Sequence, residues 1–327
     1  MIGRLSHKTK QLFFVIIKLS IVVGAIYFIY TKLTTNEKLD FDVFIAFLTK
    51  NDVFSIKSIV FLFFLTIFNW FFEIQKWKNL VCFIKNITFF DALKQSLASH
   101  TVSIFTPNRI GDYGAKAIFY KAQLRKRILL LNLISNMAQM LVTLVFGITG
   151  LSLFIIKYDV DISYYTLLKY IALVIVIVAL FIFGIKYNPI KIKGLSISRI
   201  IFFIKGVSIK IHLKNGLFSI LRYLIFSFQF YYLLTLFGVG LQYLDAMIII
   251  TSMYLLASII PTIFVLDVIV KGGIALYLFS FIGVDELTIL SITTLMWLLN
   301  FVLPSVFGSL FVMNFNYYKE IDTISNL

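Results

Sequence analysis

Two stretches of this chain place an aspartate, a proline, a second aspartate and a lysine at nearly the same spacing inside apolar sequence. The first stretch contains Asp91, Pro107, Asp112 and Lys116, and the second contains Asp245, Pro261, Asp267 and Lys271. In both, the second aspartate precedes the lysine by four residues, so the two side chains can pair along one helix face. A charge inside a lipid-spanning segment costs about 2.5–3.5 kcal/mol on insertion scales. We therefore interpret the stretches as two copies of one unit, with a site between them.

The first copy concentrates ionisable residues over positions 106–116. Arg109 offers a planar fork that suits a phosphate group, and a helix restarting near Gly111 would direct free backbone N–H groups at an anion. Gly111 also permits a tight turn or the close approach of a ligand or helix. We predict that Arg109 and Lys116 hold a lipid phosphate while Asp112 orients them, or binds a cationic headgroup or a proton. The alternative is a self-neutralising Asp112–Lys116 pair that only stabilises the segment.

The second copy keeps the aspartate and the lysine but lacks the arginine and the asparagine. The residues between Pro261 and Asp267 are mostly apolar, which suits contact with acyl chains or closure of the site from the other side. A purely structural Asp267–Lys271 pair is the alternative. The candidate ligand-binding residues are Asn108, Arg109, Gly111, Asp112, Lys116, Asp267 and Lys271.

Composition places these residues in membrane-spanning helices. The chain is 60% hydrophobic with 36 Phe, and its mean hydropathy of +0.96 excludes an ordinary soluble domain. Apolar runs predict full spans near 12–31, 56–72, 128–156, 166–185, 217–238 and 287–313. The basic start before 12–31 resembles a signal peptide, but no small-residue cleavage site follows, so we expect an uncleaved first span.

The distribution of Lys and Arg predicts how the spans are oriented. Basic residues flank the first copy on both sides, whereas the connections around the second copy are uncharged or acidic. By the positive-inside rule, the first copy enters and leaves from the cytoplasm and the second from the opposite side. Repeats 56–156 and 217–313 are then related by inversion, with 166–185 as a linking span and 186–215 as a basic cytoplasmic segment. Both termini are expected in the cytoplasm.

Proline interrupts each copy before it can span the membrane. Sixteen positions separate Asp91 from Pro107, which is only about 24 Å of helix, and Pro107 removes a backbone donor. Pro261 has the same place in the second copy. We therefore expect an all-α polytopic membrane protein, a single domain with about six full spans and two re-entrant helical hairpins in an inverted repeat. Pairs of short transmembrane helices are the alternative.

Four further polar residues lie in apolar surroundings. Glu73 stands among aromatic residues at an expected membrane edge, where interfacial anchoring is favoured over a secondary site role. For His100, a hydrogen-bonded buried histidine is favoured over a proton relay. Gln139 and Asn300 each precede a Phe-Gly pair by seven residues and predict hydrogen bonds between helices.

The sequence contains no recognisable metal cluster, nucleotide motif or nucleophile triad, so we expect no metal, no cofactor and no catalytic residue. The single Cys82 cannot form an internal disulfide. The net charge of +15 is explained by an interfacial helix between Arg199 and Lys205 on anionic lipid, without nucleic acid.

The chain resembles the transmembrane flippase domain of the lysylphosphatidylglycerol synthase family, in a stand-alone bacterial form. The resemblance rests on Asn69-Trp70 with Glu73, Lys76-Trp77, the segment 106–112, and Arg222-Tyr223 with Gln229. The family commonly has glutamate at the position of Asp112, and its second motif is richer in glycine. The resemblance implies a bacterial inner-membrane protein that moves aminoacylated or related anionic phospholipids between leaflets, with a partner synthase. Residues 314–327 are too few for a fused synthase domain, so we expect no lysyl transfer.

The leading hypothesis is therefore a flippase-like lipid translocator with a central cavity between two inverted hairpins. One alternative is a membrane-embedded enzyme or accessory subunit that acts on a lipid or polyprenyl phosphate, with Asp112 as acid–base. Another is a scaffold for a partner synthase.

Overall fold

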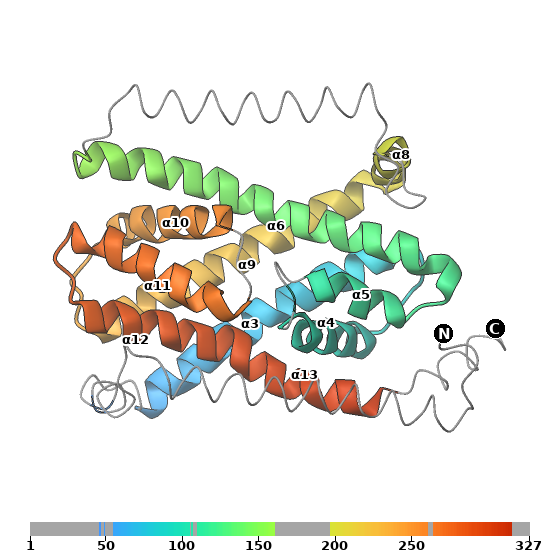
Figure 1. Ribbon diagram of the computed structural model, residues 1–327, viewed down its shortest axis with the longest axis horizontal. Coiled ribbons are helices and arrows are strands. Elements are labelled where there is room, and N and C mark those ends of the chain that lie inside the picture. The colour runs from blue at the N-terminus through green and yellow to red at the C-terminus, as the bar shows by residue number, and fades with distance from the viewer. Residues whose placement is uncertain are drawn as a thin grey trace.

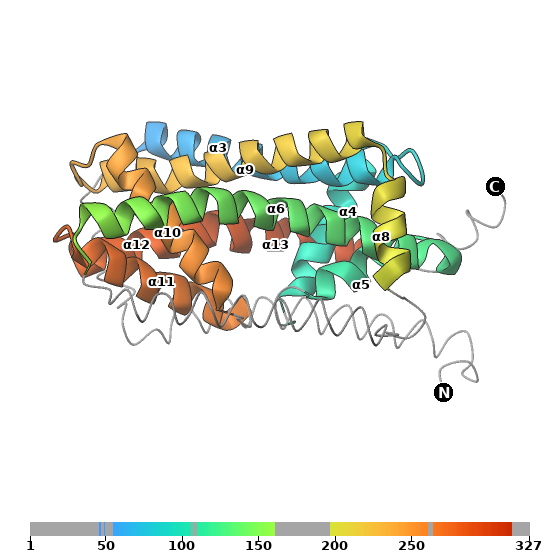
Figure 2. The same ribbon diagram turned by 90° about the horizontal axis from the view of Figure 1, so that it is seen from above.

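The computed structural model describes residues 55–104, 106, 110–160, 197–260 and 264–315, with isolated positions 46 and 49 before them. Within these residues every regular element is a helix (Figures 1 and 2). The helices are α3 (Ile56–Val81), α4 (Phe89–Ser103), α5 (Ile110–Ile118), α6 (Ala122–Lys157), α8 (Ile197–Gly206), α9 (Ile209–Leu236), α10 (Tyr243–Ile259), α11 (Phe264–Ser280), α12 (Glu286–Trp297), the π-helical segment η2 (Leu298–Val302) and α13 (Leu303–Asn314).

Four of these helices are long and apolar enough to cross a membrane. They are α3, α6, α9 and the continuous helix Glu286–Asn314, which joins α12, η2 and α13. Their positions match the predicted spans at 56–72, 128–156, 217–238 and 287–313, and the short run at 56–72 extends to Val81 as expected. The predicted spans at 12–31 and 166–185 lie outside the described residues.

The predicted basic segment 186–215 overlaps the start of α9, which begins at Ile209, eight residues before the predicted span at 217–238. Ser208 is its N-cap residue. Lys210 and Lys214 lie one turn apart on α9 with both side chains exposed, and lysine is a good helix former, so the charges do not oppose the helix. The preceding helix, α8, contains the stretch from Arg199 to Lys205, where the sequence predicted a helix.

The interrupted copies form two pairs of short helices, α4 with α5 and α10 with α11. Figure 1 shows the first pair in the right half of the molecule and the second pair in the left half. Helix α4 ends at Ser103 and α5 begins at Ile110, and α10 ends at Ile259 and α11 begins at Phe264, so each proline falls between two helices. Pro107 and Pro261 themselves lie outside the described residues.

The first aspartate of each copy has a local role at the start of its helix. Asp91 and Thr88 form a capping box, in which each side chain accepts a hydrogen bond from the other residue's backbone N–H, at 3.2 and 3.1 Å. Asp245 instead forms an ion pair with Lys157 at the end of α6. Both aspartates therefore fix helix ends and lie away from the central cavity described below.

Glycines bring each short-helix pair against a long helix of the other half. A Cβ at Gly308 of α13 would overlap the carbonyl oxygen of Leu97 and the hydroxyl of Thr101 on α4. A Cβ at Gly147 of α6 would overlap Leu255 on α10. Small residues allow helices in membranes to approach this closely. Helix α4 thus packs on α13, and α10 packs on α6.

The two ends of the helical bundle differ in charge. The connections α3–α4, α5–α6 and α8–α9 lie at the right of Figure 1, and the connections α9–α10 and α11–α12 lie at the left with the end of α6. Within the described residues, the right end carries the basic residues Lys78, Lys85, Lys94, Lys121, Arg125, Lys126, Arg127, Arg199, Lys205, Lys210 and Lys214 with one acidic residue, Asp91. The left end carries the basic residues Lys57 and Lys157 with the acidic residues Asp159, Asp245, Asp285 and Glu286.

Candidate functional site

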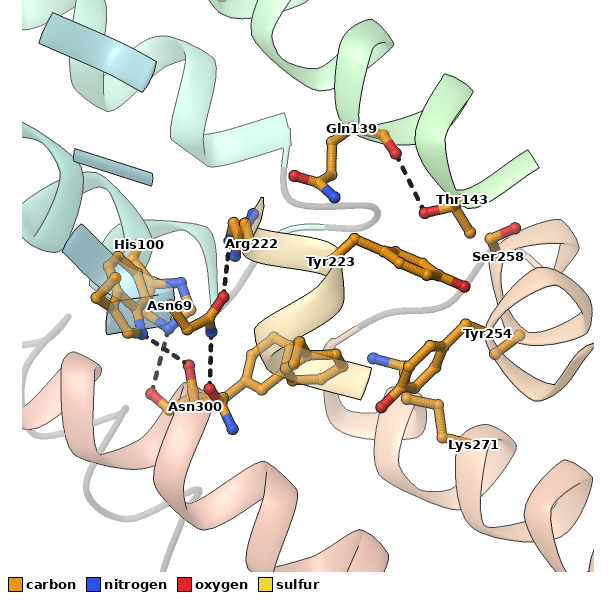
Figure 3. Close-up of a pocket in the computed structure, with 14 residues that line it drawn as sticks. Asn69, His100, Gln139, Thr143, Arg222, Tyr223, Tyr254, Ser258, Lys271 and Asn300 are labelled. Atoms are coloured by element: carbon orange, nitrogen blue, oxygen red, sulfur yellow. Dashed lines mark hydrogen bonds between the residues drawn. The ribbon is translucent and has the colours of Figure 1, made fainter. Parts of the chain in front are cut away.

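Two adjoining cavities lie between the long helices. The tyrosine lobe, of about 340 Å³, is lined by Tyr223 and Tyr254 among others (Figure 3). The carboxylate lobe, of about 420 Å³, is lined by Glu73 and Asp112 among others. The two lobes share Trp70, Gln139, Thr143, Arg222, Ala257, Ser258, Lys271 and Phe301. We treat them as one central cavity with two chemically different parts.

The central cavity lies at mid-height of all four candidate spans. Asn69, Gln139, Arg222 and Asn300 each lie within about one residue of the middle of their helix, on α3, α6, α9 and Glu286–Asn314 respectively. All four line the tyrosine lobe. Polar and charged side chains in the middle of membrane spans are costly and usually mark a substrate pathway. Four of them gathered around one cavity make it the candidate site.

The ion pair predicted for the first copy is confirmed. The Lys116 ammonium lies 3.1 Å from Asp112 Oδ2 and donates to Asn132 Oδ1 at 2.9 Å, with the ring of Trp77 4.6 Å away. Asp112 also accepts from Asn132 Nδ2 at 2.7 Å and from Ser99 Oγ at 2.6 Å. Lys116 is only 2% exposed. This closed network matches the interpretation of a pair that stabilises the segment, and lipid binding by the pair stays a prediction.

The other residues of the first copy are only partly described. Pro107, Asn108 and Arg109 lie outside the described residues. Gly111 is in the first turn of α5, where its N–H donates to Thr106 Oγ1 at 2.7 Å and a Cβ would lie 2.8 Å from the same oxygen. The close approach that Gly111 permits is therefore to Thr106.

Glu73 does not lie at an exposed edge, so the predicted anchoring role is wrong. Its side chain is 13% exposed and lines the carboxylate lobe, where Oε2 lies 3.0 Å from Lys76 Nζ and 2.9 Å from Arg222 Nη1. Arg222 Nε also donates to Asn69 Oδ1 at 3.1 Å. Because Lys76 and Arg222 both balance the carboxylate, Glu73 can stay ionised within the helical bundle.

A chain of side-chain amides continues from Arg222 across the bundle. Asn69 Nδ2 donates to Asn300 Oδ1 at 2.7 Å, and Asn300 Nδ2 donates to Gln229 Oε1 at 2.8 Å. Gln139 accepts from Lys76 Nζ at 3.4 Å and donates to the carbonyl of Ser219 at 3.3 Å. The predicted interhelical hydrogen bonds of Gln139 and Asn300 are thus confirmed. Figure 3 shows Asn69 between Arg222 and Asn300.

The π-helical segment η2 has backbone carbonyls that accept hydrogen bonds from side chains on α3 and α4. Pro304 has no N–H to give to the carbonyl of Asn300, and this oxygen accepts from Trp70 Nε1 at 3.3 Å. The next carbonyl, of Phe301, accepts from His100 Nε2 at 3.2 Å. His100 is 1% exposed, which confirms the hydrogen-bonded buried histidine.

Lys271 places the second copy in the same cavity. Its side chain lines both lobes, and its ammonium lies 5.0 Å from the centre of the Phe301 ring. Asp267 belongs to α11, but its side chain lies outside the described residues. Around the carboxylate lobe the described lining residues include three cations, Lys116, Arg222 and Lys271, and two carboxylates, Glu73 and Asp112. Among these described residues the cations outnumber the carboxylates by one.

Reasoning from spacing missed several residues of the cavity. Arg222 entered only through the family resemblance, although an arginine in the middle of the apolar run 217–238 is a signal by itself. Asn132, which does not line the cavity but bonds to Asp112 and Lys116, has the same kind of signal in the run 128–156. Tyr223 and Tyr254 carry no such signal, because tyrosine is common in apolar segments of this chain.

Among the residues that the structure describes, no group of three His, Cys, Asp or Glu side chains is placed to hold a metal ion. Comparison of the chain with protein-family models, with curated proteins and with solved structures found no match.

Proposed function

We propose that this protein moves a lipid with an anionic headgroup between the two leaflets of a membrane. The observation that carries the proposal is a polar cavity at the middle of four apolar helices, with three cations and two carboxylates among its described lining residues. A headgroup that crosses a membrane needs a polar site at mid-depth, because the hydrocarbon offers it neither charge nor hydrogen bonds. Together the lobes fall in the size range of ligand pockets, about 300–1,000 Å³.

The rim of the cavity supports a lipid rather than a soluble ion as the substrate. Asn136 and Met140 of α6, with Ser258 and Ile260 at the end of α10, line the carboxylate lobe and are exposed. Since Asn136 and Met140 lie near the middle of the candidate span α6, we infer that the cavity opens sideways, toward the place of the lipid tails. A headgroup could enter through this opening while its acyl chains stay outside.

Helix packing supports an inverted repeat in which α3–α6 corresponds to α9–α13. Leu97 and Thr101, which contact Gly308, lie six and ten residues after Asp91. Thr251 and Leu255, which contact Gly147, lie six and ten residues after Asp245. Gly147 and Gly308 each lie eight residues after the amides Gln139 and Asn300.

Each short-helix pair therefore packs on the last helix of the opposite half in the same way. The pairs lie at opposite ends of the molecule (Figure 1), as expected for two re-entrant hairpins of opposite polarity. Such repeats, with binding near the midplane, are typical of transporters.

The charge difference between the ends predicts the orientation in a bacterial cytoplasmic membrane, with the basic end inside. Cys82 is exposed at the basic end and can be used as a probe. A membrane-impermeant maleimide should label Cys82 in inverted membrane vesicles and leave it unlabelled in right-side-out vesicles. The control variant Cys82→Ala with Ser280→Cys should show the reverse, because Ser280 is the exposed last residue of α11, next to the α11–α12 connection at the other end. Labelling of Cys82 from outside would contradict the orientation.

Transport is tested in liposomes that contain the purified protein and a fluorescent phosphatidylglycerol. The fluorophore is attached to one acyl chain close to the headgroup. Dithionite bleaches the fluorophore only in the outer leaflet, so loss of more than about half of the signal reports movement. Arg222→Gln should slow this movement on the order of tenfold or more, because it removes a cation from the cavity. Arg222→Lys, which keeps the charge and can still pair with Glu73, should retain part of the activity.

Arg125→Gln at the basic end serves as the matched control, since Arg125 does not line either lobe. If the Arg222→Gln and Arg125→Gln variants have equal thermal stability and move lipid at equal rates, the central cavity is not part of the transport path. No movement of any anionic lipid by the native protein would contradict the proposal. A chemically altered lipid found by mass spectrometry would favour the membrane-embedded enzyme.

A further inference from the structure

The tyrosine lobe contains two buried hydroxyl groups that form no geometrically good hydrogen bond with the residues that the structure describes. Tyr254 is 8% exposed and Tyr223 is 5% exposed. Within the described part of the chain, the Tyr254 hydroxyl has no hydrogen-bond partner. The Tyr223 hydroxyl lies beside Ser227 on the next turn of α9, but the two hydroxyls do not meet the geometry of a hydrogen bond. A buried hydroxyl without a partner is unfavourable, and such groups are rare in folded proteins. The position of these two indicates that a bound molecule completes their hydrogen bonds.

Aromatic contacts hold the two tyrosine rings in place. The ring of Tyr254 lies 5.1 Å from Phe226 and 6.1 Å from Tyr223, measured between ring centres. Tyr223 in turn stacks on Phe146 at 5.1 Å. Rings packed in this way have few alternative orientations, so the hydroxyls are oriented before a ligand binds. Preorganised donors lose little entropy when they bind a ligand.

The charges around the tyrosine lobe identify the ligand atoms as anionic oxygens. Arg222 and Lys271 line this lobe, and no carboxylate is among its described lining residues. The two lobes thus differ, because Glu73 and Asp112 border only the carboxylate lobe. Figure 3 shows Tyr223, Tyr254 and Lys271 on one side of the lobe and Arg222 on the other. Two hydroxyl donors and two cations suit a phosphate group, whose oxygens accept several charge-assisted hydrogen bonds.

We infer that the tyrosine lobe is the phosphate-binding subsite, in which the hydroxyls of Tyr223 and Tyr254 donate to the oxygens of a lipid phosphodiester held by Arg222 and Lys271. This inference rests on the proposed lipid transport and assigns the headgroup phosphate to one of the two lobes. The carboxylate lobe then takes the remainder of the headgroup. The phosphate, which every phospholipid carries, is recognised at mid-depth by groups from α9, α10 and α11.

The test uses the double variant Tyr223→Phe with Tyr254→Phe, which removes only the two hydroxyl oxygens. Thermal unfolding of the protein in detergent is measured with and without dihexanoyl phosphatidylglycerol, with dihexanoylglycerol as the lipid without phosphate. In the native protein the phospholipid should raise Tm by about 5 °C at about 100 times its Kd, and dihexanoylglycerol should not. In the double variant the rise should fall below about 1 °C.

The unliganded Tm distinguishes ligand binding from a structural role. If the hydroxyls only supported the fold, the double variant would unfold at a lower temperature without lipid. We expect its Tm to be unchanged or higher, because an unpaired polar group has been removed from a buried site. Tyr231→Phe, a change on the same helix away from both lobes, should leave the lipid-induced rise intact.

Two further outcomes would overturn the inference. If the phospholipid raises the Tm of the double variant as much as that of the native protein, the phosphate binds elsewhere. The dithionite assay in liposomes would still test the proposed lipid movement independently. A rise as large with inorganic phosphate as with the phospholipid would assign the subsite to a soluble anion. That result would contradict the lipid as the ligand even if the hydroxyls are needed.

Discussion

Replacing Lys116 with Met is expected to lower the free energy of unfolding by about 3–5 kcal/mol, which is the usual cost of removing one partner of a buried ion pair. Lys116 is 2% exposed, and its ammonium lies between Asp112, Asn132 and the ring of Trp77. Without it the Asp112 carboxylate stays buried without its ammonium partner, and it still accepts from Asn132 and Ser99. The measurement is equilibrium unfolding in mixed micelles of a mild detergent and SDS.

The double variant Asp112→Asn with Lys116→Met makes this prediction specific. It removes both charges at once, so most of the stability lost in Lys116→Met should return. A double-mutant cycle with the two single variants measures this interaction between Asp112 and Lys116. Lys126→Met, an exposed lysine on α6, should change the stability by less than about 0.5 kcal/mol. If Lys116→Met is as mild as Lys126→Met, the buried network does not exist in the membrane.

The same double variant separates the two interpretations of the Asp112–Lys116 pair. If the pair only stabilises α5 against α4 and α6, the double variant should be stable and should still move lipid in liposomes. If the pair also binds the headgroup, the variant should be stable and inactive. We expect transport to be retained at a rate within about threefold of the native rate, since Lys116 already donates to Asp112 and Asn132.

The sequence predicted the four described spans well, because a long apolar run leaves a helix as almost the only way to satisfy the backbone in lipid. It also predicted the interruptions around Pro107 and Pro261, since proline cannot continue the hydrogen-bond ladder. The start of α9 at Ile209 was missed because helix ends depend on caps and on side-chain exposure more than on hydropathy.

The candidate site was harder to predict than the fold. Asp112 and Lys116 form the expected pair because their spacing of four fixes their distance on a helix. Glu73 was misplaced because its true partner, Arg222, is far away in the sequence and meets it only when α3 packs on α9. Tyr254 was missed for a different reason. An unpaired hydroxyl is visible only after every neighbouring donor and acceptor has been placed.

Replacing Gly308 with Ala is expected to destabilise the protein by about 1–3 kcal/mol, in the range of overpacked cores. The added Cβ would overlap the carbonyl oxygen of Leu97, which belongs to the backbone of α4 and cannot rotate away. Helix α13 must therefore move away from α4. Gly147→Ala should have a similar effect between α6 and α10, where the overlap is with Leu255.

Gly216→Ala in α9 is the matched control, because nothing lies within 4 Å of the Cβ it would add. In a helix this change should raise the stability by up to about 1 kcal/mol, since alanine is the better helix former. In the same unfolding assay, Gly216→Ala should therefore raise the free energy of unfolding, whereas Gly308→Ala and Gly147→Ala should lower it. If Gly308→Ala is also stabilising, α4 and α13 do not pack as described. The hydrogen bonds from His100 and Trp70 to η2 would then lose their support, because the same packing brings these donors to the carbonyls beside the cavity.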